Sequence, residues 1–170
     1  MRNKKLIIVA HCLLNQNATL LGWERAPGPF PELLSLLSEH QVSILQLPCP
    51  ELAYLGLERP PMTFEEYHTF EYKVHCIHML KPFSMQLRHY LNHDYEILGI
   101  LGIEESPSCD INNNRGVFMK ALRITMNALK SGSFEATERL DLPEMMDAGN
   151  YERYLSSLKN LLNVNGFEAK

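Results

Sequence analysis

Three runs of aliphatic residues stand out along the chain, at Lys5 to Ala10, Val42 to Leu47 and Glu96 to Ile103. Each run is almost uninterrupted, which is typical of a strand covered on both faces. A weaker strand is predicted at Ala136 to Leu140. The basic and apolar start of the chain is interpreted as the first strand and not as a signal peptide, because His11 breaks the apolar run and no small-residue cleavage site follows.

Helical periodicity fills much of the remaining sequence. It predicts helices near Pro31 to Glu39, over Phe64 to His93 with a break or kink near Pro82, over Gly116 to Leu129, and from about Tyr151 to Leu162. Strands separated by helices of this length predict an α/β fold of three layers, in which a small parallel, Rossmann-like sheet has helices on both faces. We expect one domain over residues 1–170.

Composition and charge limit the classes of partner that the protein is expected to bind. The chain has 170 residues and a net charge of −4 without a basic run, which argues against nucleic acid as a partner. No apolar stretch reaches the roughly 18 residues that span a bilayer, so no membrane partner is expected. We expect a cytoplasmic protein that acts on a small molecule, and the sequence leaves its oligomeric state open.

Three of the four cysteines share one structural context. Cys12, Cys49 and Cys109 each follow a predicted strand, whereas Cys76 lies inside a predicted helix. The carboxyl ends of parallel strands meet at one edge of a sheet, so these three thiols are expected to converge there. The strand before Cys12 is expected to be central, between the strands that end at Cys49 and Cys109.

Three thiolates suit a metal site with an open position. A structural zinc ion takes four protein ligands, and a fully ligated iron–sulfur cluster takes four thiolates. Three cysteines leave one coordination position free for a substrate. Soft thiolates favour zinc, cuprous copper or an iron–sulfur cluster.

The segments around these cysteines carry a family resemblance. "HCLLNQNA", "QLPCPELAYLGLERP" and "GIEESPSC" resemble the three cysteine motifs of the thiouracil desulfidase family, over roughly Leu6 to Cys109. The resemblance implies that Cys12, Cys49 and Cys109 hold a four-iron, four-sulfur (4Fe-4S) cluster whose fourth iron takes the sulfur from a thiolated nucleobase. By motif position, it implies Glu51 as the catalytic acid/base and Ser106 as its helper.

Four further residues are candidates for substrate binding. Arg59 stands near the position of a family arginine, and Ser108 belongs to the third motif. Asn15 and Asn17 can hydrogen-bond the edge of a base, or form a turn with their own backbone. The chain departs from the family where "NQNATLLGW" follows the first motif and where Asp110 follows the third cysteine. These departures predict a substrate other than 2-thiouracil.

Plainer interpretations of the same residues stay open. The cysteines can be buried apolar side chains, and Glu51 can be a helix cap. His75, Cys76 and His78 resemble a metal cluster in sequence. On a helix, however, His75 and His78 share a face while Cys76 points about 100° away from His75, so core or surface roles are expected. His11, beside Cys12 in an expected strand, is interpreted as structural or as a support to a ligand.

Two other functions compete with the desulfidase. One is a hydrolase or transferase that uses Cys12 or Cys109 as a nucleophile with an unidentified histidine. The other is a module without enzyme activity that binds a metal or a small molecule.

Overall fold

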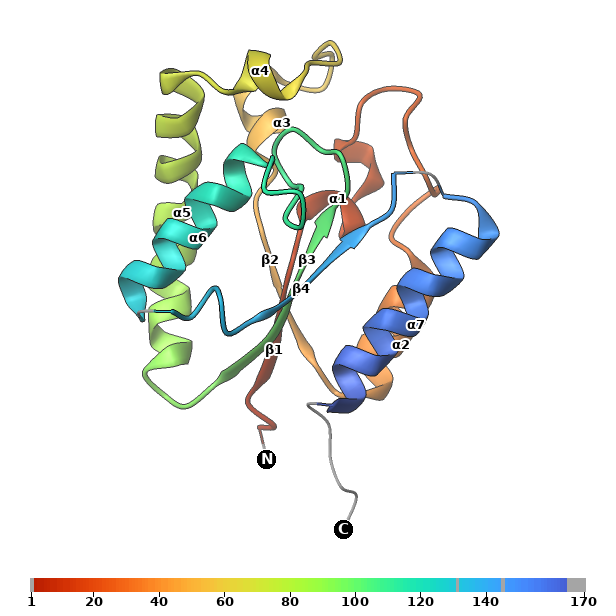
Figure 1. Ribbon diagram of the computed structural model, residues 1–170, viewed down its shortest axis with the longest axis vertical. Coiled ribbons are helices and arrows are strands. Elements are labelled where there is room, and N and C mark those ends of the chain that lie inside the picture. Colours follow the sequence, from red (N-terminus) through yellow and green to blue (C-terminus); the bar gives the residue numbers. More distant parts are fainter. Residues whose placement is uncertain (1, 131, 145, 165–170) are drawn as a thin grey trace.

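Four parallel strands form the centre of the protein, in the order β2-β1-β3-β4 (Figure 1). They are β1 (Lys5–Val9), β2 (Ser43–Gln46), β3 (Glu96–Ile103) and β4 (Glu138–Leu142). The structure is a computed structural model that describes residues 2–130, 132–144 and 146–164. The prediction of a parallel sheet with β1 between β2 and β3 is confirmed.

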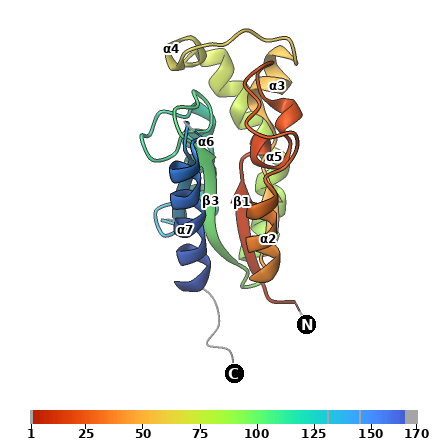
Figure 2. The same cartoon turned by 90° about the vertical axis from the view of Figure 1, so that its right-hand side faces the viewer.

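Helices cover both faces of this sheet. The longer ones are α2 (Pro31–Glu39), α5 (Phe70–Leu91), α6 (Val117–Leu129) and α7 (Ala148–Val164). The shorter ones are α1 (His11–Leu14), η1 (Gln16–Ala18), α3 (Pro50–Leu55) and α4 (Phe64–Tyr67). Helices α5 and α6 cover one face, and Figure 2 looks onto the other face, which α2 and α7 cover. This distribution follows from right-handed crossovers between parallel strands, and it confirms the three-layer α/β prediction.

The central strands are buried on both sides, which explains their unbroken aliphatic sequences. Ile7, Ile8 and Val9 of β1 have no exposed surface, and Ile100 and Leu101 of β3 are equally enclosed. Each such side chain contributes about 1.5–3 kcal/mol of hydrophobic stabilisation. The sheet is therefore anchored by β1 and β3.

Strand β2 differs from the expectation of a strand covered on both faces. It lies at the edge of the sheet, and Ser43 and Gln46 are exposed. An edge strand has one neighbour and can keep polar side chains in water, so its pattern is less apolar.

Two other boundaries were predicted wrongly. Helix α5 continues through Pro82, and the interruption falls instead before Thr69, whose hydroxyl accepts a hydrogen bond from the Tyr72 amide at 3.2 Å. Strand β4 begins at Glu138, because Ala136 and Thr137 still belong to the preceding turn. Local capping and turn bonds decided both cases.

The loop between β3 and α6, residues 104–116, is held by backbone hydrogen bonds. The first amides of α6 have no partner within the helix. Here Val117 donates to the Pro107 carbonyl at 3.0 Å and Phe118 donates to the Ser108 carbonyl at 3.0 Å. The Ile103 amide donates to the Cys109 carbonyl, also at 3.0 Å. The end of β3 and the start of α6 therefore both hold Cys109 in position.

This loop packs so closely that two neighbouring positions have no room for a side chain. A Cβ atom at Gly102 would overlap the Asp141 carboxylate and the Cys109 carbonyl. A Cβ atom at Gly116 would overlap the backbone of Ser108 and Asp110. Both glycines are required by close approach of the Cys109 loop.

We predict that Gly102→Ala lowers the free energy of unfolding by about 1–3 kcal/mol or more, because the loop must move to admit the methyl group. Gly99→Ala is the matched control in the same strand, since its methyl would meet the flexible Leu161 side chain, 3.0 Å away. Chemical denaturation measures both. Equal losses in the two variants would contradict the close packing described for Gly102.

Candidate functional site

Three cysteines from separate segments line one cavity at the carboxyl edge of the sheet. Its volume is about 300 Å³. Cys12 comes from α1, Cys49 directly precedes α3, and Cys109 comes from the β3–α6 loop. The complete lining is Cys12, Thr19, Leu20, Trp23, Arg25, Cys49, Pro50, Glu51, Arg59, Pro61, Met62, Ile103, Glu104, Glu105, Ser106, Pro107, Cys109 and Glu144.

Cys12 follows the first strand, as predicted, and lies in the helical turn α1. The chain leaves the sheet at Ala10, whose amide donates to the Leu101 carbonyl at 2.9 Å. The buried Gln16 side chain then donates from Nε2 to the Cys12 carbonyl at 2.6 Å. The turn and its glutamine anchor therefore determine the direction of the Cys12 side chain.

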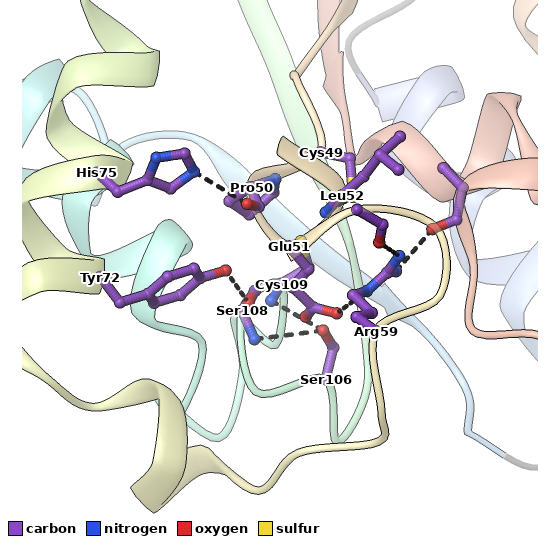
Figure 3. A network of polar contacts seen from close by, with 12 residues as sticks. Cys49, Pro50, Glu51, Leu52, Arg59, Tyr72, His75, Ser106, Ser108 and Cys109 are labelled. Carbon is purple, nitrogen blue, oxygen red and sulfur yellow. Dashed lines mark hydrogen bonds and ion pairs between the residues drawn. The ribbon is translucent and has the colours of Figure 1, made fainter. Parts of the chain in front are cut away.

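Cys49 occupies the N-cap position of α3. Pro50 starts the helix, where its missing amide costs no hydrogen bond. The Cys49 sulfur accepts a hydrogen bond from the Leu52 amide at 3.4 Å (Figure 3). A helix N-terminus stabilises negative charge, so this position favours the thiolate.

Cys109 is held in place by Ser106. The Ser106 hydroxyl oxygen accepts hydrogen bonds from the amides of Cys109 at 3.0 Å and Ser108 at 3.4 Å (Figure 3). The hydroxyl proton of Ser106 has no acceptor among the described residues. It remains available for a molecule in the cavity.

The three thiols differ in acidity. A hydrogen bond with Cys12 lowers the pKa of Cys49 to about 7, although burial acts in the opposite direction. The same contact and burial raise the pKa of Cys12 well above its ordinary value. Burial also raises the pKa of Cys109 well above its ordinary value. Near neutral pH the cavity therefore contains one partly ionised thiol and two protonated ones.

Glu51 is fixed by a buried arginine. Its carboxylate lies 3.3 Å from Arg59 Nε, and the two side chains are 14% and 2% exposed. Arg59 also donates to the Gly56 carbonyl at 3.2 Å and to the Ala18 carbonyl at 2.7 Å. These bonds tie α3, the loop that follows it and η1 together, as Figure 3 shows for the arginine and its acceptors. Glu51 thus enters the cavity in one orientation.

Three proposed substrate-binding residues lie outside the cavity lining. The side-chain oxygen Oδ1 of Asn15 accepts a hydrogen bond from the Asn17 backbone amide at 3.2 Å, which is the turn that the sequence left open as an alternative. The Asn17 side chain is exposed and also bonds Asn15. The buried Ser108 hydroxyl bonds the Tyr72 hydroxyl at 2.7 Å. Of the four candidates, only Arg59 lines the cavity.

The histidine-containing segment of α5 contributes no residue to the cavity lining. Cys76 is buried in the core, and burial raises its pKa to about 12. His75 Nε2 contacts the Pro50 carbonyl at 3.0 Å, while His78 is exposed. His11 contacts the Leu47 carbonyl at 3.3 Å. Among the described residues that line the cavity, none is a histidine.

Several lining residues were missed or left without a role by the sequence. Trp23, Arg25 and Glu144 were not singled out, and Glu104 and Glu105, which lie within the third motif, were left open between paired acids and a solvated loop. The sequence signal that could have pointed to this wall of the cavity was the single tryptophan, Trp23, two residues before Arg25 in a segment rich in glycine and proline. Such a loop has no periodicity, so its direction toward the cavity depends on the tertiary structure.

The described residues contain no group of three or more His, Cys, Asp or Glu side chains arranged to hold a single metal ion. A cluster distributes its thiolates over separate iron atoms and needs wider spacing than one ion does. The three thiols supply the soft donors that an iron–sulfur cluster requires, and a cavity adjoins them. Three thiols along one cavity leave the fourth position of a closed zinc site without a cysteine ligand.

The fold and the cavity define an α/β protein with three cysteines at the carboxyl edge of its sheet. The chain is 44% identical over 120 residues to the uncharacterized protein MJ0003 of Methanocaldococcus jannaschii. The aligned residues cover 71% of this chain and 76% of that protein. The chain belongs to the same family as this archaeal protein. No protein-family model matches the chain, and no solved structure gives a significant match.

We predict that Cys49 ionises near pH 7 in the metal-free protein, because its pKa is lowered to about 7 by the hydrogen bond with Cys12. The thiolate absorbance in the far ultraviolet should rise through this pH. Cys12→Ala should shift the midpoint upward, since it removes that hydrogen bond. Cys76→Ala is the control, because the pKa of Cys76 is about 12 and its loss should leave the midpoint unchanged. An unchanged titration midpoint in Cys12→Ala would contradict the hydrogen bond between Cys12 and Cys49.

Proposed function

We propose that the protein removes sulfur from a small thiolated compound and uses Cys12, Cys49 and Cys109 to hold a 4Fe-4S cluster. The observation that carries the proposal is that these three cysteines, which come from three different strand ends, line one cavity together with Glu51 and Ser106. The resemblance of the surrounding motifs to thiouracil desulfidases supports the same conclusion. When bound, such a cluster supplies a Lewis-acidic iron without a protein ligand, which can accept sulfur.

The reaction is a hydrolysis in which a C–O bond forms and a C–S bond breaks. Glu51 is our candidate for the general base that takes the proton of the attacking water. Its fixed contact with Arg59 keeps the carboxylate in the cavity. A base must stay within hydrogen-bond reach of the water, so this restraint supports the role.

Ser106 is our candidate for orienting the substrate. Its oxygen already accepts the Cys109 amide, and its proton is free to donate to a heteroatom of the ligand. The residue therefore couples ligand orientation to the Cys109 loop. Loss of the Ser106 hydroxyl changes no formal charge, so we expect it to lower turnover less than loss of the Glu51 carboxylate.

The proposal includes a cytoplasmic location. All four cysteines are free thiols, which supports the expected cytoplasmic location, where thiols stay reduced. Among the described residues, no helix is long and apolar enough to cross a membrane.

A second candidate function is supported by the acidity of Cys49. A helix N-cap position and a pKa of about 7 are properties of nucleophilic cysteines. The sequence had suggested Cys12 or Cys109 for such a reaction, but the raised pKa of both makes Cys49 the better nucleophile. A nucleophile mechanism predicts a colourless enzyme that alkylation of Cys49 inactivates.

Anaerobic purification followed by iron and sulfide analysis tests the proposal. We expect brown protein with about four iron atoms and four sulfides per chain. Cys49→Ser should lose iron and colour, whereas Cys76→Ala should keep both, because Cys76 is buried in the core and does not line the cavity. Active but iron-free protein would reject the cluster and favour the nucleophile, and one zinc ion per chain would favour a binding module.

Glu51→Gln separates proton transfer from ligand binding. We expect full iron content and a turnover lower by about 10²-fold or more, because the amide cannot accept the proton. Ser106→Ala is the comparison and should lose less activity. Sulfide release from several thiolated bases measures turnover. Unchanged turnover in Glu51→Gln would leave Glu51 as a helix cap, and loss of iron would make it a support of the cluster.

A further inference from the structure

The loop between η1 and α2 supplies a wall of the cavity that the proposed chemistry does not use. Thr19, Leu20, Trp23 and Arg25 all line the cavity beside the three thiols. The loop is anchored to the site by Gln16, whose side chain donates to the Cys12 carbonyl at 2.6 Å and accepts from the Arg25 amide at 2.8 Å. One buried side chain thus couples the position of Arg25 to that of Cys12.

Trp23 presents an aromatic ring to the cavity and to solvent. Its side chain is 59% exposed although it lines the cavity, and it is the single tryptophan of the chain. A large aromatic ring at the wall of a cavity offers a flat apolar surface on which a planar ligand can stack. Pro61 and Met62 add apolar surface to the same cavity. This combination suits a flat ring that can stack on the indole.

Arg25 is the cation of the cavity that has free donors. Its guanidinium makes no hydrogen bond or ion pair with the described residues, whereas the Arg59 guanidinium binds Glu51 and two carbonyls. Burial lowers the pKa of Arg25, while an ionised Cys12 and the Glu144 carboxylate act in the opposite direction. A partly buried guanidinium without bonded acceptors has lost hydration that a ligand can replace.

The charges around the cavity limit what the ligand can be. Four carboxylates line it, but Glu51 is paired with Arg59 and Glu105 with Arg115. Glu104 and Glu144 therefore stand against the single unpaired guanidinium of Arg25. Carboxylates are therefore in excess, and a phosphate group would be repelled. An uncharged ring with carbonyl or nitrogen acceptors has no such penalty.

We propose that Trp23 and Arg25 are the specificity-determining residues of this cavity, with Trp23 stacking on a planar heterocycle and Arg25 donating hydrogen bonds to a ring acceptor of an uncharged, unphosphorylated ligand. The inference rests on the proposed function for the idea that the natural ligand carries sulfur. Ring recognition itself needs neither sulfur nor a cluster, so the two can be tested separately.

The test uses the full-length, iron-free protein and uracil, a flat and uncharged ring with carbonyl acceptors but no sulfur. Because Trp23 is the single tryptophan, its fluorescence reports on the cavity directly. We expect saturable quenching by uracil. Uridine monophosphate should bind about 10-fold or more weakly, because the excess carboxylates repel its phosphate. Absence of saturable binding, or tighter binding of the monophosphate, would overturn the inference.

Variants identify the residues, with calorimetry as the readout that does not need tryptophan. Arg25→Gln should weaken uracil binding about 10-fold or more through loss of charged donors. Trp23→Ala should weaken it about 5-fold or more through loss of stacking. Leu21→Ala is the matched control in the same loop, because Leu21 is 89% exposed and does not line the cavity. It should bind like the unmodified protein.

Folding is checked by thermal unfolding, and Arg25→Lys provides a second variant that keeps the charge but loses the planar fork. Normal uracil affinity in folded Arg25→Gln or Trp23→Ala, or an equal loss in Leu21→Ala, would refute the assignment. Uracil binding by a protein that takes up no iron would instead reject the proposed function alone. Sulfide release with unchanged affinity in the Arg25 and Trp23 variants would reject this inference alone.

Discussion

The convergence of parallel strand ends is the constraint on which the site depends. Strands β1, β2 and β3 run side by side in one direction, so the segments that follow them meet at one edge of the sheet. Cys12, Cys49 and Cys109 are separated by dozens of residues, yet they line one cavity because each follows one of these strands. Burial of β1 and β3 on both faces holds this edge rigid.

Buried polar contacts then fix the loops that no apolar packing could orient. Arg59 joins Glu51 to the backbone of Gly56 and Ala18, and Gln16 joins Cys12 to Arg25. A buried polar group that loses its partner costs more than the bond contributes, so each contact strongly favours one arrangement. The cavity walls are consequently specified by a few side chains that take no part in the proposed reaction.

The same burial creates unequal thiols. Desolvation disfavours the thiolate of Cys109, while the N-cap position and the Cys12 contact favour the thiolate of Cys49. Cysteine ligands must be deprotonated to bind metal, so the binding of iron at this site would release protons. In the proposed cluster site Cys49 would be the first ligand, because its lowered pKa makes it the easiest of the three thiols to ionise.

The sequence by itself determined the elements whose periodicity is strong. It predicted α2 and β3 with the observed boundaries, the parallel order around β1, and the three cysteines that approach one cavity. It also pointed to Glu51, Arg59 and Ser106, which line the cavity, although their chemistry is still a proposal.

Only the tertiary structure decided which polar side chains face the cavity. Asn15 and Asn17 close a local turn and Ser108 bonds Tyr72, whereas Trp23 and Arg25 line the cavity from a loop without periodicity. A break or kink was expected near Pro82, and α5 is not broken there. A strand or helix shows which of its residues are buried through the spacing of its own apolar residues, so one segment is enough to predict it. The direction of a loop side chain depends on contacts such as those of Gln16 and Arg59, whose partners are distant in sequence or belong to the backbone.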